Sequence, residues 1–256
     1  IMVGGYTMIF AAPAALALGL PAWAAVAAAI IVCVLVGMAT ELIAYRPVRK
    51  KGTAMTALIT AIAMSLFLEN LAQAIPAIGP NPKVASQMFA AGGISIGTVT
   101  MEYTTIITIV ISAVVMTVLY EFTQKTRLGR AMRCVSEDKA AATLMGINVN
   151  HTILLTFAIG SGLAAIAALM YMAQYPKVYT TMGSLLGLKA FVSAVLGGIG
   201  IIPGAVLGGI VIGLIESFPT SYISSSMADT FVFLILIIVL IIKPAGILGR
   251  NAGEKV

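Results

Sequence analysis

Long stretches of apolar residues follow one another along this chain and constrain its fold more than any motif does. They cover residues 1–20, 23–44, 53–75, 103–122, 152–175, 185–199, 203–218 and 230–243. A helix needs about 20 mostly apolar residues to cross a bilayer, because each residue adds only about 1.5 Å. Several stretches are shorter, and the two around residues 199–203 could form one helical hairpin or a broken helix. The pattern predicts an all-α, polytopic transmembrane bundle of about eight membrane segments.

The composition supports a single transmembrane domain over residues 1–256. Hydrophobic residues make up 60% of the chain and charged residues 9%, whereas soluble domains carry about 25% charged residues. A protein with so few charged residues would expose too much apolar surface to be soluble in water. An intrinsically disordered chain is excluded as well, because disorder requires low hydrophobicity. The sequence also lacks the alternation of polar and apolar residues that is typical of β-barrel strands. The chain begins at Ile1 inside an apolar stretch without a signal-peptide pattern, so we expect an N-terminal segment of the natural protein to be missing.

Basic residues lie mostly in the connections between the apolar stretches and indicate the orientation. The chain has fifteen Lys and Arg against nine Asp and Glu. If the helices alternate in direction, twelve of the fifteen lie on one side, which the positive-inside rule assigns to the cytoplasm together with the C-terminus. These twelve are Arg46, Arg49, Lys50, Lys51, Lys125, Arg127, Arg130, Arg133, Lys139, Lys243, Arg250 and Lys255. No extended basic face with aromatic residues accompanies them, so nucleic-acid binding is not expected.

Side chains that could carry out a reaction are few. Cys33 and Cys134 are far apart and His151 is the single histidine, so we expect neither a disulfide framework nor a metal site. No convergent acid and base pair indicates an enzyme, and no cofactor is expected. The phosphate-binding pattern Gly-x-x-x-x-Gly-Lys-Ser/Thr does not occur in the sequence. If ATP drives this protein, another chain must hydrolyse it.

The connection formed by residues 124–151 has the spacing of a helix with one apolar face. Two sets of apolar residues follow this spacing, namely Leu128, Met132 and Val135, and Ala140, Leu144 and Ile147. One interpretation is a helix lying on anionic headgroups, and the other is a helix that docks into a groove of a cytoplasmic partner. A lipid-surface helix gains nothing from the acidic residues Glu137 and Asp138, so their presence favours a protein partner.

Several short motifs occur in order along the whole chain. Those within residues 124–151 are Gly129-Arg130-Ala131-Met132-Arg133-Cys134, Glu137-Asp138 and Leu144-Met145-Gly146-Ile147-Asn148. The others are Tyr45-Arg46-Pro47-Val48-Arg49, Lys189-Ala190-Phe191, Val195-Leu196-Gly197-Gly198-Ile199-Gly200, Pro203-Gly204-Ala205 and Pro244-Ala245-Gly246-Ile247-Leu248-Gly249-Arg250. Together they resemble the permease subunits of branched-chain amino acid ABC transporters, and most of all the first of the two permease types in such systems.

This resemblance implies a membrane subunit of an ATP-driven importer for branched-chain or similar hydrophobic amino acids in a bacterial inner membrane. The implied partners are a second permease subunit (a hetero- or homodimer), two ATPase subunits and a periplasmic substrate-binding protein. The resemblance also leaves urea or short amides as an alternative substrate class, because it extends to permeases of the same family for these solutes.

The resemblance also identifies residues 124–151 as the coupling segment that contacts the ATPases. ABC importers generally carry a Glu-Ala-Ala-x-x-x-Gly signature there, but this chain has Ala140 at the first position and Gly146 at the last. The polar contact of the missing Glu would then come from Glu137 or Asp138. The expected coupling residues are Gly129, Arg130, Arg133, Glu137, Asp138, Ala141, Leu144 and Gly146.

Small residues between positions 197 and 208 are expected to bring two helices together and to turn the chain between them. Gly200, Gly204 and Gly208 recur every four residues, a spacing typical of close packing between membrane helices. No strand precedes them, as a nucleotide-binding loop would require. The residues expected in this packing and turn are Gly197, Gly198, Gly200, Pro203, Gly204 and Gly208.

Two carboxylates, Glu69 and Glu216, fall inside apolar stretches and allow two interpretations. They could lie at the membrane interface near a helix end, or they could line the translocation path, with Asn70 and Gln73 adding neutral polar groups. The second interpretation also suits a different class of protein, a secondary transporter driven by an ion gradient. Such a carrier would not need the charged segment at residues 124–151, which favours the ABC permease.

Overall fold

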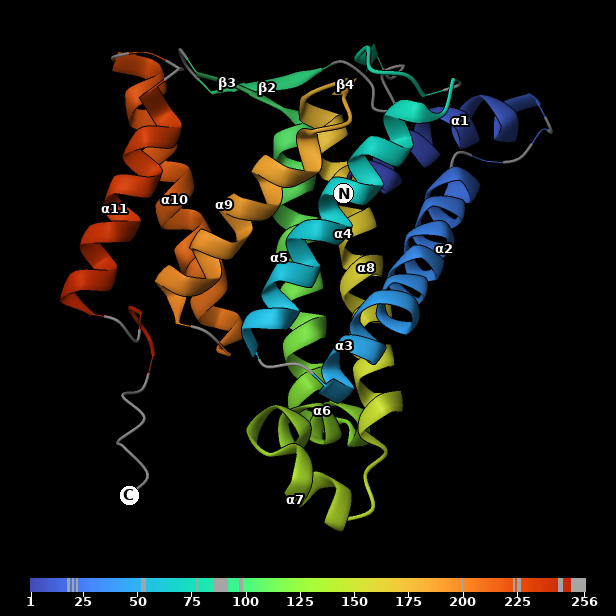
Figure 1. Ribbon diagram of the computed structural model, residues 1–256. Coiled ribbons are helices and arrows are strands. Elements are labelled where there is room, and N and C mark those ends of the chain that lie inside the picture. The colour runs from blue at the N-terminus through green and yellow to red at the C-terminus, as the bar shows by residue number, and fades with distance from the viewer. Residues whose placement is uncertain are drawn as a thin grey trace. The chain divides into compact units, whose positions relative to one another are not determined.

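The computed structural model describes residues 1–17, 19, 21, 23–51, 54–76, 78–84, 92–96, 99–198, 200–222, 224, 227–243 and 246–249. They form two compact units (Figure 1). The first unit comprises Ile1–Ala113 and Glu121–Gly183, and the second comprises Val114–Tyr120 and Ser184–Val256.

The longer helices of the first unit follow the predicted apolar stretches, whereas its shorter helices at residues 46–51, 127–137 and 139–144 lie in segments predicted as connections. The helices of this unit are α1 (Met2–Ala17), α2 (Trp23–Thr40), a π-helical turn (Glu41–Tyr45), α3 (Arg46–Lys51), α4 (Ala54–Ala74), most of α5 (Tyr103–Lys125), α6 (Arg127–Glu137), α7 (Lys139–Leu144) and α8 (Val149–Gln174). The α2 helix, the π-helical turn and α3 run on without a break, so that Trp23–Arg49 forms one apolar helix of 27 residues.

Close packing of small side chains holds α1, α2 and α8 together. Ala29, Ala165 and Ala168 are fully buried. A Cβ built on Gly37 of α2 would lie 2.2 Å from Oγ of Ser161 on α8, so only glycine fits at this crossing. Small residues let helix backbones approach closely, which compensates for the weak hydrophobic drive between helices in lipid.

Among the described residues, four short strands lie in the connections between the helices, and they were not predicted. The strand β1 (Lys83–Val84) pairs antiparallel with β4 (Lys177–Val178), and β2 (Gly93–Ile96) pairs antiparallel with β3 (Val99–Glu102). Lys83 lies opposite Val178, a pairing of two distant connections that no local pattern indicates. These strands are too short to change the all-α class.

The second unit is built from α9 (Met182–Gly197), α10 (Ile202–Tyr222) and α11 (Ala228–Ile242). Its core contains Val192, Ile212 and Val232, one from each helix. The two stretches around residues 199–203 are therefore separate helices. Gly198 and Gly200, with φ of +107° and +92°, lie in the turn between them, where glycine adopts a left-handed backbone at no steric cost.

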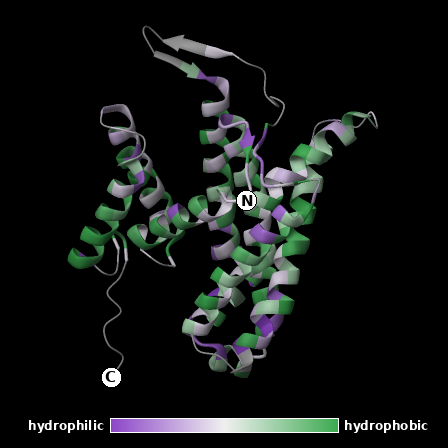
Figure 2. Cartoon of the chain, turned by 45° about the horizontal axis from the view of Figure 1, so that its top comes forward, coloured by the Kyte–Doolittle hydropathy of each residue, from purple (hydrophilic) through white to green (hydrophobic). Residues whose placement is uncertain are grey.

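Five helices in the described part of the chain are long and apolar enough to cross a membrane. They are Trp23–Arg49, Met55–Ala74, Tyr103–Lys125, Val149–Gln174 and Ile202–Tyr222. Shorter apolar helices at Met2–Ala17, Met182–Gly197 and Ala228–Ile242 match the other three predicted stretches in position. Figure 2 shows hydrophobic residues along the length of the helices, as expected for segments that cross a bilayer. The chain is an all-α, polytopic membrane protein.

Candidate functional site: a two-helix segment and an apolar cavity

The predicted coupling segment, residues 124–151, contains two short helices that meet at Asp138. The hydroxyl of Thr126 caps α6 by accepting a hydrogen bond from the N–H of Gly129 at 3.0 Å. Asp138 interrupts the helix with an extended backbone, and its carboxylate caps α7 by accepting from the N–H groups of Ala140 at 2.7 Å and Ala141 at 3.2 Å. Asp satisfies the orphan donors of a helix start, so the charged residue at this position ends one helix and begins the next.

Two contacts attach α6 to the end of α5. A Cβ on Gly129 would lie 2.4 Å from the carbonyl oxygen of Phe122, so the backbones of α6 and α5 touch at this glycine. The guanidinium of Arg133 donates to Oε1 of Gln124 at 2.8 Å and to the carbonyl oxygen of Gln124 at 3.3 Å. The position of α6 is therefore set by the long helix that precedes it.

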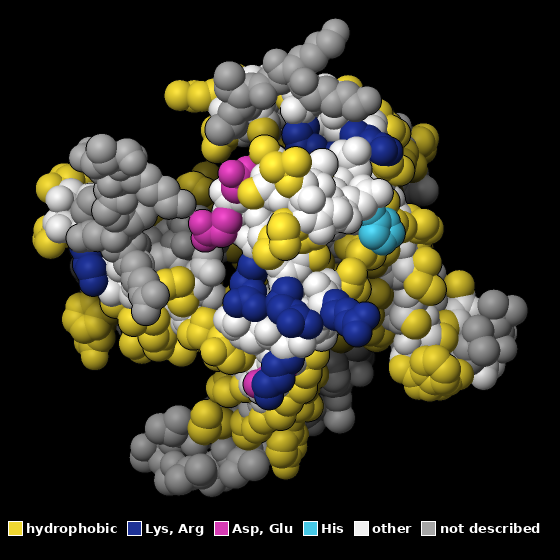
Figure 3. Space-filling view, turned by 90° about the horizontal axis from the view of Figure 1, so that it is seen from below, with side chains coloured by type: hydrophobic (Ala, Val, Ile, Leu, Met, Phe, Trp, Pro, Cys, Tyr) yellow, Lys and Arg dark blue, Asp and Glu magenta, His cyan; other side chains and the backbone are white. Residues whose placement is uncertain are grey.

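A hollow of about 780 Å³ lies between α6 and α7. Five of the eight expected coupling residues line it, namely Arg130, Arg133, Glu137, Asp138 and Ala141. Figure 3 shows Lys and Arg side chains gathered on this face, with acidic side chains beside them. A surface with both charge signs around a hollow is suited to a partner that inserts its own charged and apolar side chains.

The other three expected coupling residues lie outside this hollow. Gly129 is buried against α5 as described above, and Gly146 turns the chain after α7 with a φ of +79°. The side chains of Leu144 and Met145 are 88% and 82% exposed at the tip of the segment. Leu144 was predicted on the apolar face of a helix, and in the structure that face of α7 is open.

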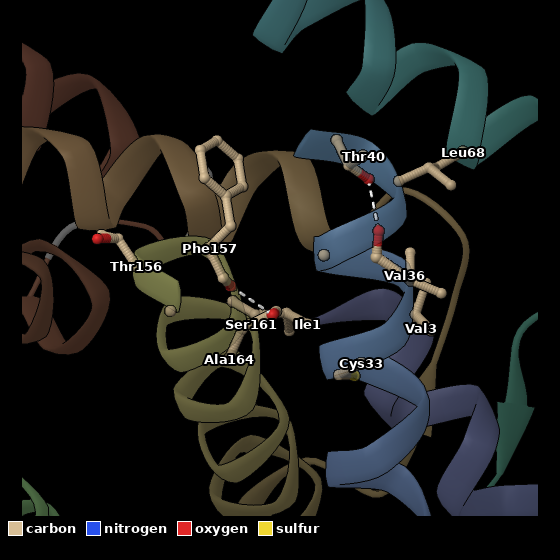
Figure 4. Close-up of a pocket in the computed structure, with 12 residues that line it drawn as sticks. Ile1, Val3, Cys33, Val36, Thr40, Leu68, Thr156, Phe157, Ser161 and Ala164 are labelled. Carbon is tan, nitrogen blue, oxygen red and sulfur yellow. Dashed lines mark hydrogen bonds between the residues drawn. The ribbon is translucent and has the colours of Figure 1, made fainter. Parts of the chain in front are cut away.

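An apolar cavity of about 410 Å³ lies within the first unit, between α1, α2, α4 and α8 (Figure 4). The sequence reasoning did not identify it. It is lined by Ile1, Val3, Cys33, Val36, Gly37, Thr40, Leu68, Thr156, Phe157, Gly160, Ser161 and Ala164. Its three hydroxyl groups donate to carbonyl oxygens of their own helices: Thr40 to Val36, Thr156 to Thr152 and Ser161 to Phe157. Each hydroxyl oxygen thus keeps acceptor capacity toward a polar guest.

Residues proposed for the translocation path lie on two helices. Glu69, Asn70 and Gln73 are on α4 in the first unit, where Asn70 donates to the carbonyl oxygen of Leu66 at 2.7 Å and Gln73 donates to Oγ1 of Thr180 at 3.2 Å. Glu69 is half-buried. Glu216 lies on α10 in the second unit, so the structure does not bring these four side chains into one described site.

Glu216 belongs to an ion cluster that sequence reasoning missed. The ammonium group of Lys189 on α9 lies 2.8 Å from Oε1 of Glu216 and 2.8 Å from Oδ1 of Asp229 on α11. Lys189 is mostly buried, with 17% of its side chain exposed. A signal was present, because Lys189 is a basic residue within an apolar stretch, and such a residue needs a counter-charge.

Metal ligands do not gather in the part of the chain described here. No three His, Cys, Asp or Glu side chains among these residues could hold a metal ion together. Cys33 is buried on α2 and Cys134 is exposed on α6.

Comparison with known proteins gives consistent similarities. Residues 1–240 match the family described as "Branched-chain amino acid transport system / permease component". The high-affinity branched-chain amino acid transport system permease protein BraD of Pseudomonas aeruginosa is 41% identical over 268 residues, which cover 100% of this chain and 85% of BraD. The LivH permease proteins of Salmonella typhimurium and Escherichia coli are each 37% identical over 270 residues, with the same coverage. No solved structure matches the chain.

Proposed function

Because this chain belongs to the family of permease components of branched-chain amino acid transport systems, we propose that it is the membrane subunit of an ATP-driven importer of branched-chain or similar hydrophobic amino acids. The observation that carries this proposal is the family match over nearly the whole chain, which includes the two-helix segment α6–α7. The sequence has no phosphate-binding loop, so ATP hydrolysis belongs to partner subunits.

In this proposal the α6–α7 segment couples transport to ATP hydrolysis. The segment docks into a groove of an ATPase subunit, and the residues around the hollow between its two helices contact that subunit. Arg130, Arg133, Glu137 and Asp138 supply charge, and the small side chain of Ala141 allows close approach. Leu144 at the open tip adds an apolar contact, while Gly129 and Gly146 set where the two helices begin and end. Two such ATPases, a second permease and a periplasmic binding protein complete the importer.

The membrane arrangement follows from the same proposal. The five long helices and the three shorter apolar helices form eight membrane segments of one permease domain. Twelve of the fifteen basic residues, the coupling segment and the C-terminus then face the cytoplasm of a bacterial inner membrane.

We further propose that polar groups on α4 and α10 contribute to the translocation path. Glu69, Asn70 and Gln73 offer a carboxylate and two amides along one helix, and Glu216 offers a carboxylate whose pairing with Lys189 would open during transport. A permease of this kind needs only weak substrate contacts, because tight binding belongs to the binding protein. Glu69→Gln is expected to slow uptake in an assembled complex. A Glu69→Gln variant with wild-type uptake would show that Glu69 does not contribute to the translocation path.

The experiment that tests the proposed function is co-purification from the native membrane. The tagged chain is extracted in mild detergent, every co-eluting protein is identified by mass spectrometry, and radiolabelled leucine uptake is measured after reconstitution. Recovery of a second permease and of ATPase subunits, with leucine uptake that requires ATP, is the expected result. A chain that elutes alone and takes up solute only until a protonophore is added would overturn the proposal in favour of an ion-driven carrier.

A further inference from the structure

Arg49 connects two helices that lie far apart in the sequence. Its Nη2 is 3.0 Å from Oε1 of Glu41 and 2.9 Å from Oδ1 of Asn150, 101 positions away in the chain. A guanidinium Nη carries two hydrogens, so this one nitrogen can donate to both acceptors at once. Glu41, Arg49 and Asn150 are called the Arg49 bridge below.

The two ends of the Arg49 bridge differ in exposure. Glu41 is 1% exposed, and Arg49 is its ion-pair partner among the described residues. A buried carboxylate is costly unless it is paired, so Glu41 holds the guanidinium in place. Asn150 lies exposed at the second position of α8. The bridge therefore has one anchored end on the first long helix and one open end on α8.

The anchored end lies at an irregular point of its helix. Glu41 begins the π-helical turn, and the N–H of Arg46 donates to the carbonyl oxygen of Glu41 across five residues. Such turns are frequent at functional sites. If the π-helical turn became a regular α-helix, α2 would rotate relative to α3 by about 100° about the helix axis. The ring of Tyr45, in the same turn, packs on Phe157 of α8 with centroids 4.9 Å apart.

Two residues close to the Glu41 end of the Arg49 bridge line the apolar cavity of Figure 4. Thr40, directly before the π-helical turn, lines the cavity, and so does Phe157, the partner of Tyr45. At the other end, Asn150 follows shortly after α7 and the turn at Gly146, and the side chain of Asn148 caps α8 by accepting from the N–H of His151 at 3.1 Å. Only residues 145–149 separate α7 from Asn150, so a displacement of α7 would also displace Asn150.

From this geometry we propose that Arg49 is a positioning residue that transmits displacement of the α6–α7 segment to the π-helical turn and to the α2 wall of the cavity. The inference rests on the proposed function, because it takes the α6–α7 segment as the part that an ATPase partner moves. Arg49 itself touches neither ATP nor the transported solute in this scheme.

The test uses the assembled importer in proteoliposomes and compares uptake of radiolabelled leucine with ATP hydrolysed in the same vesicles. Asn150→Leu breaks the bridge at its exposed end and leaves the Glu41–Arg49 ion pair intact, so folding is preserved. We expect the amount of leucine moved per ATP to fall about tenfold, the effect of one charge-assisted hydrogen bond. Asn150→Asp keeps both the acceptor and the size of the side chain, and it is expected to retain the wild-type ratio. Leu is also close to Asn in size, so a difference between the two variants reports the lost acceptor and not a change in size.

A matched control exists at the opposite end of the same helix. The side chain of Gln174 donates to Oγ1 of Thr105 at 3.4 Å, so Gln174→Leu removes an inter-helix hydrogen bond of α8 that is not part of the bridge. This variant is expected to keep the wild-type ratio. If Asn150→Leu fails to assemble, the double variant Glu41→Gln with Arg49→Gln breaks the bridge without leaving a buried charge, and it should show the same fall.

The outcomes separate this inference from the proposed function. A wild-type complex without ATP-dependent leucine uptake would overturn the proposed function. A wild type that transports, together with an Asn150→Leu variant or a double variant that moves as much leucine per ATP, would overturn the role of Arg49 alone. An equal fall in Asn150→Leu and Gln174→Leu would also overturn it, because the effect would then reflect general loosening of α8.

Discussion

At Gly146 the backbone leaves α7 with a φ of +79°, which glycine adopts freely and a β-branched residue does not. A Cβ built there meets no atom within 4 Å, so only the backbone conformation opposes a substitution. Gly146→Val must therefore re-form the turn between α7 and α8, at a cost of about 1–2 kcal/mol. We expect the variant to insert and assemble but to hydrolyse ATP without moving leucine, measured as uptake per ATP in proteoliposomes.

Gly146→Asn is the control for this prediction, because asparagine tolerates the left-handed conformation. It should keep most of the uptake. Normal uptake by Gly146→Val would contradict the assignment of the α6–α7 segment as the coupling element.

Lys189 carries a second prediction at the scale of single residues. Its ammonium group is the counter-charge of both Glu216 and Asp229, and removing one member of such a cluster leaves charges uncompensated in an apolar setting. Lys189→Met is expected to lower the unfolding temperature of the purified protein by several degrees. The triple variant Lys189→Met, Glu216→Gln and Asp229→Asn should recover most of that loss, since neutral residues need no counter-charge. An unchanged unfolding temperature in Lys189→Met would show that the cluster does not hold α9, α10 and α11 together.

Between whole elements, the crossing of α9 and α10 depends on glycine at the points of contact. A Cβ on Gly208 would lie 2.2 Å from the carbonyl oxygen of Ser193, and one on Gly197 would lie 1.9 Å from the carbonyl oxygen of Gly204. Backbone atoms cannot yield as a flexible side chain does, so Gly208→Ala forces the helices apart. Overpacking of this kind costs about 1–3 kcal/mol, and thermal unfolding in detergent should begin at a lower temperature.

The matched control lies on the same helix. Gly213 also belongs to α10, but a Cβ built there meets nothing within 4 Å. Gly213→Ala should leave the unfolding temperature unchanged or raise it slightly, because alanine is the better helix former. Equal effects of the two variants would mean that helix propensity, rather than the contact with α9, sets the stability.

Elements were predictable where the signal is local. Each apolar stretch became a helix, because a segment in lipid must satisfy its own backbone hydrogen bonds. The division of the coupling segment at Asp138 was not predicted, although an Asp shortly before a run of alanines is a recognisable helix start. The pairing of β1 with β4 had no such signal, since its two strands have only two residues each and lie in distant connections.

On the scale of the whole molecule, the two cysteines provide a test of orientation. Cys134 is exposed on α6 and Cys33 is buried on α2. If the basic connections face the cytoplasm, a membrane-impermeant maleimide should label Cys134 in inside-out vesicles and not in intact spheroplasts. Cys33 should stay unlabelled in both, as the internal control, and a Cys134→Ser variant identifies the labelled site. Labelling of Cys134 from outside intact cells would reverse the proposed topology.

Several properties of this protein were determined by the sequence alone. The number of long apolar stretches and the scarcity of charge predicted an all-α membrane protein, and the ordered motifs predicted a family that the comparisons then confirmed. These properties are local or compositional, so they can be read without knowing which residues meet.

Only the tertiary structure decided which polar groups meet. Arg49 pairs with Glu41 and Asn150, Lys189 pairs with two carboxylates on other helices, and hydroxyls from α2 and α8 share one cavity. The physical reason is that helices in lipid are apolar around most of their circumference, so periodicity does not show which face turns inward. The partner of a buried charge is then set by how the helices cross, and that depends on contacts between residues far apart in the chain.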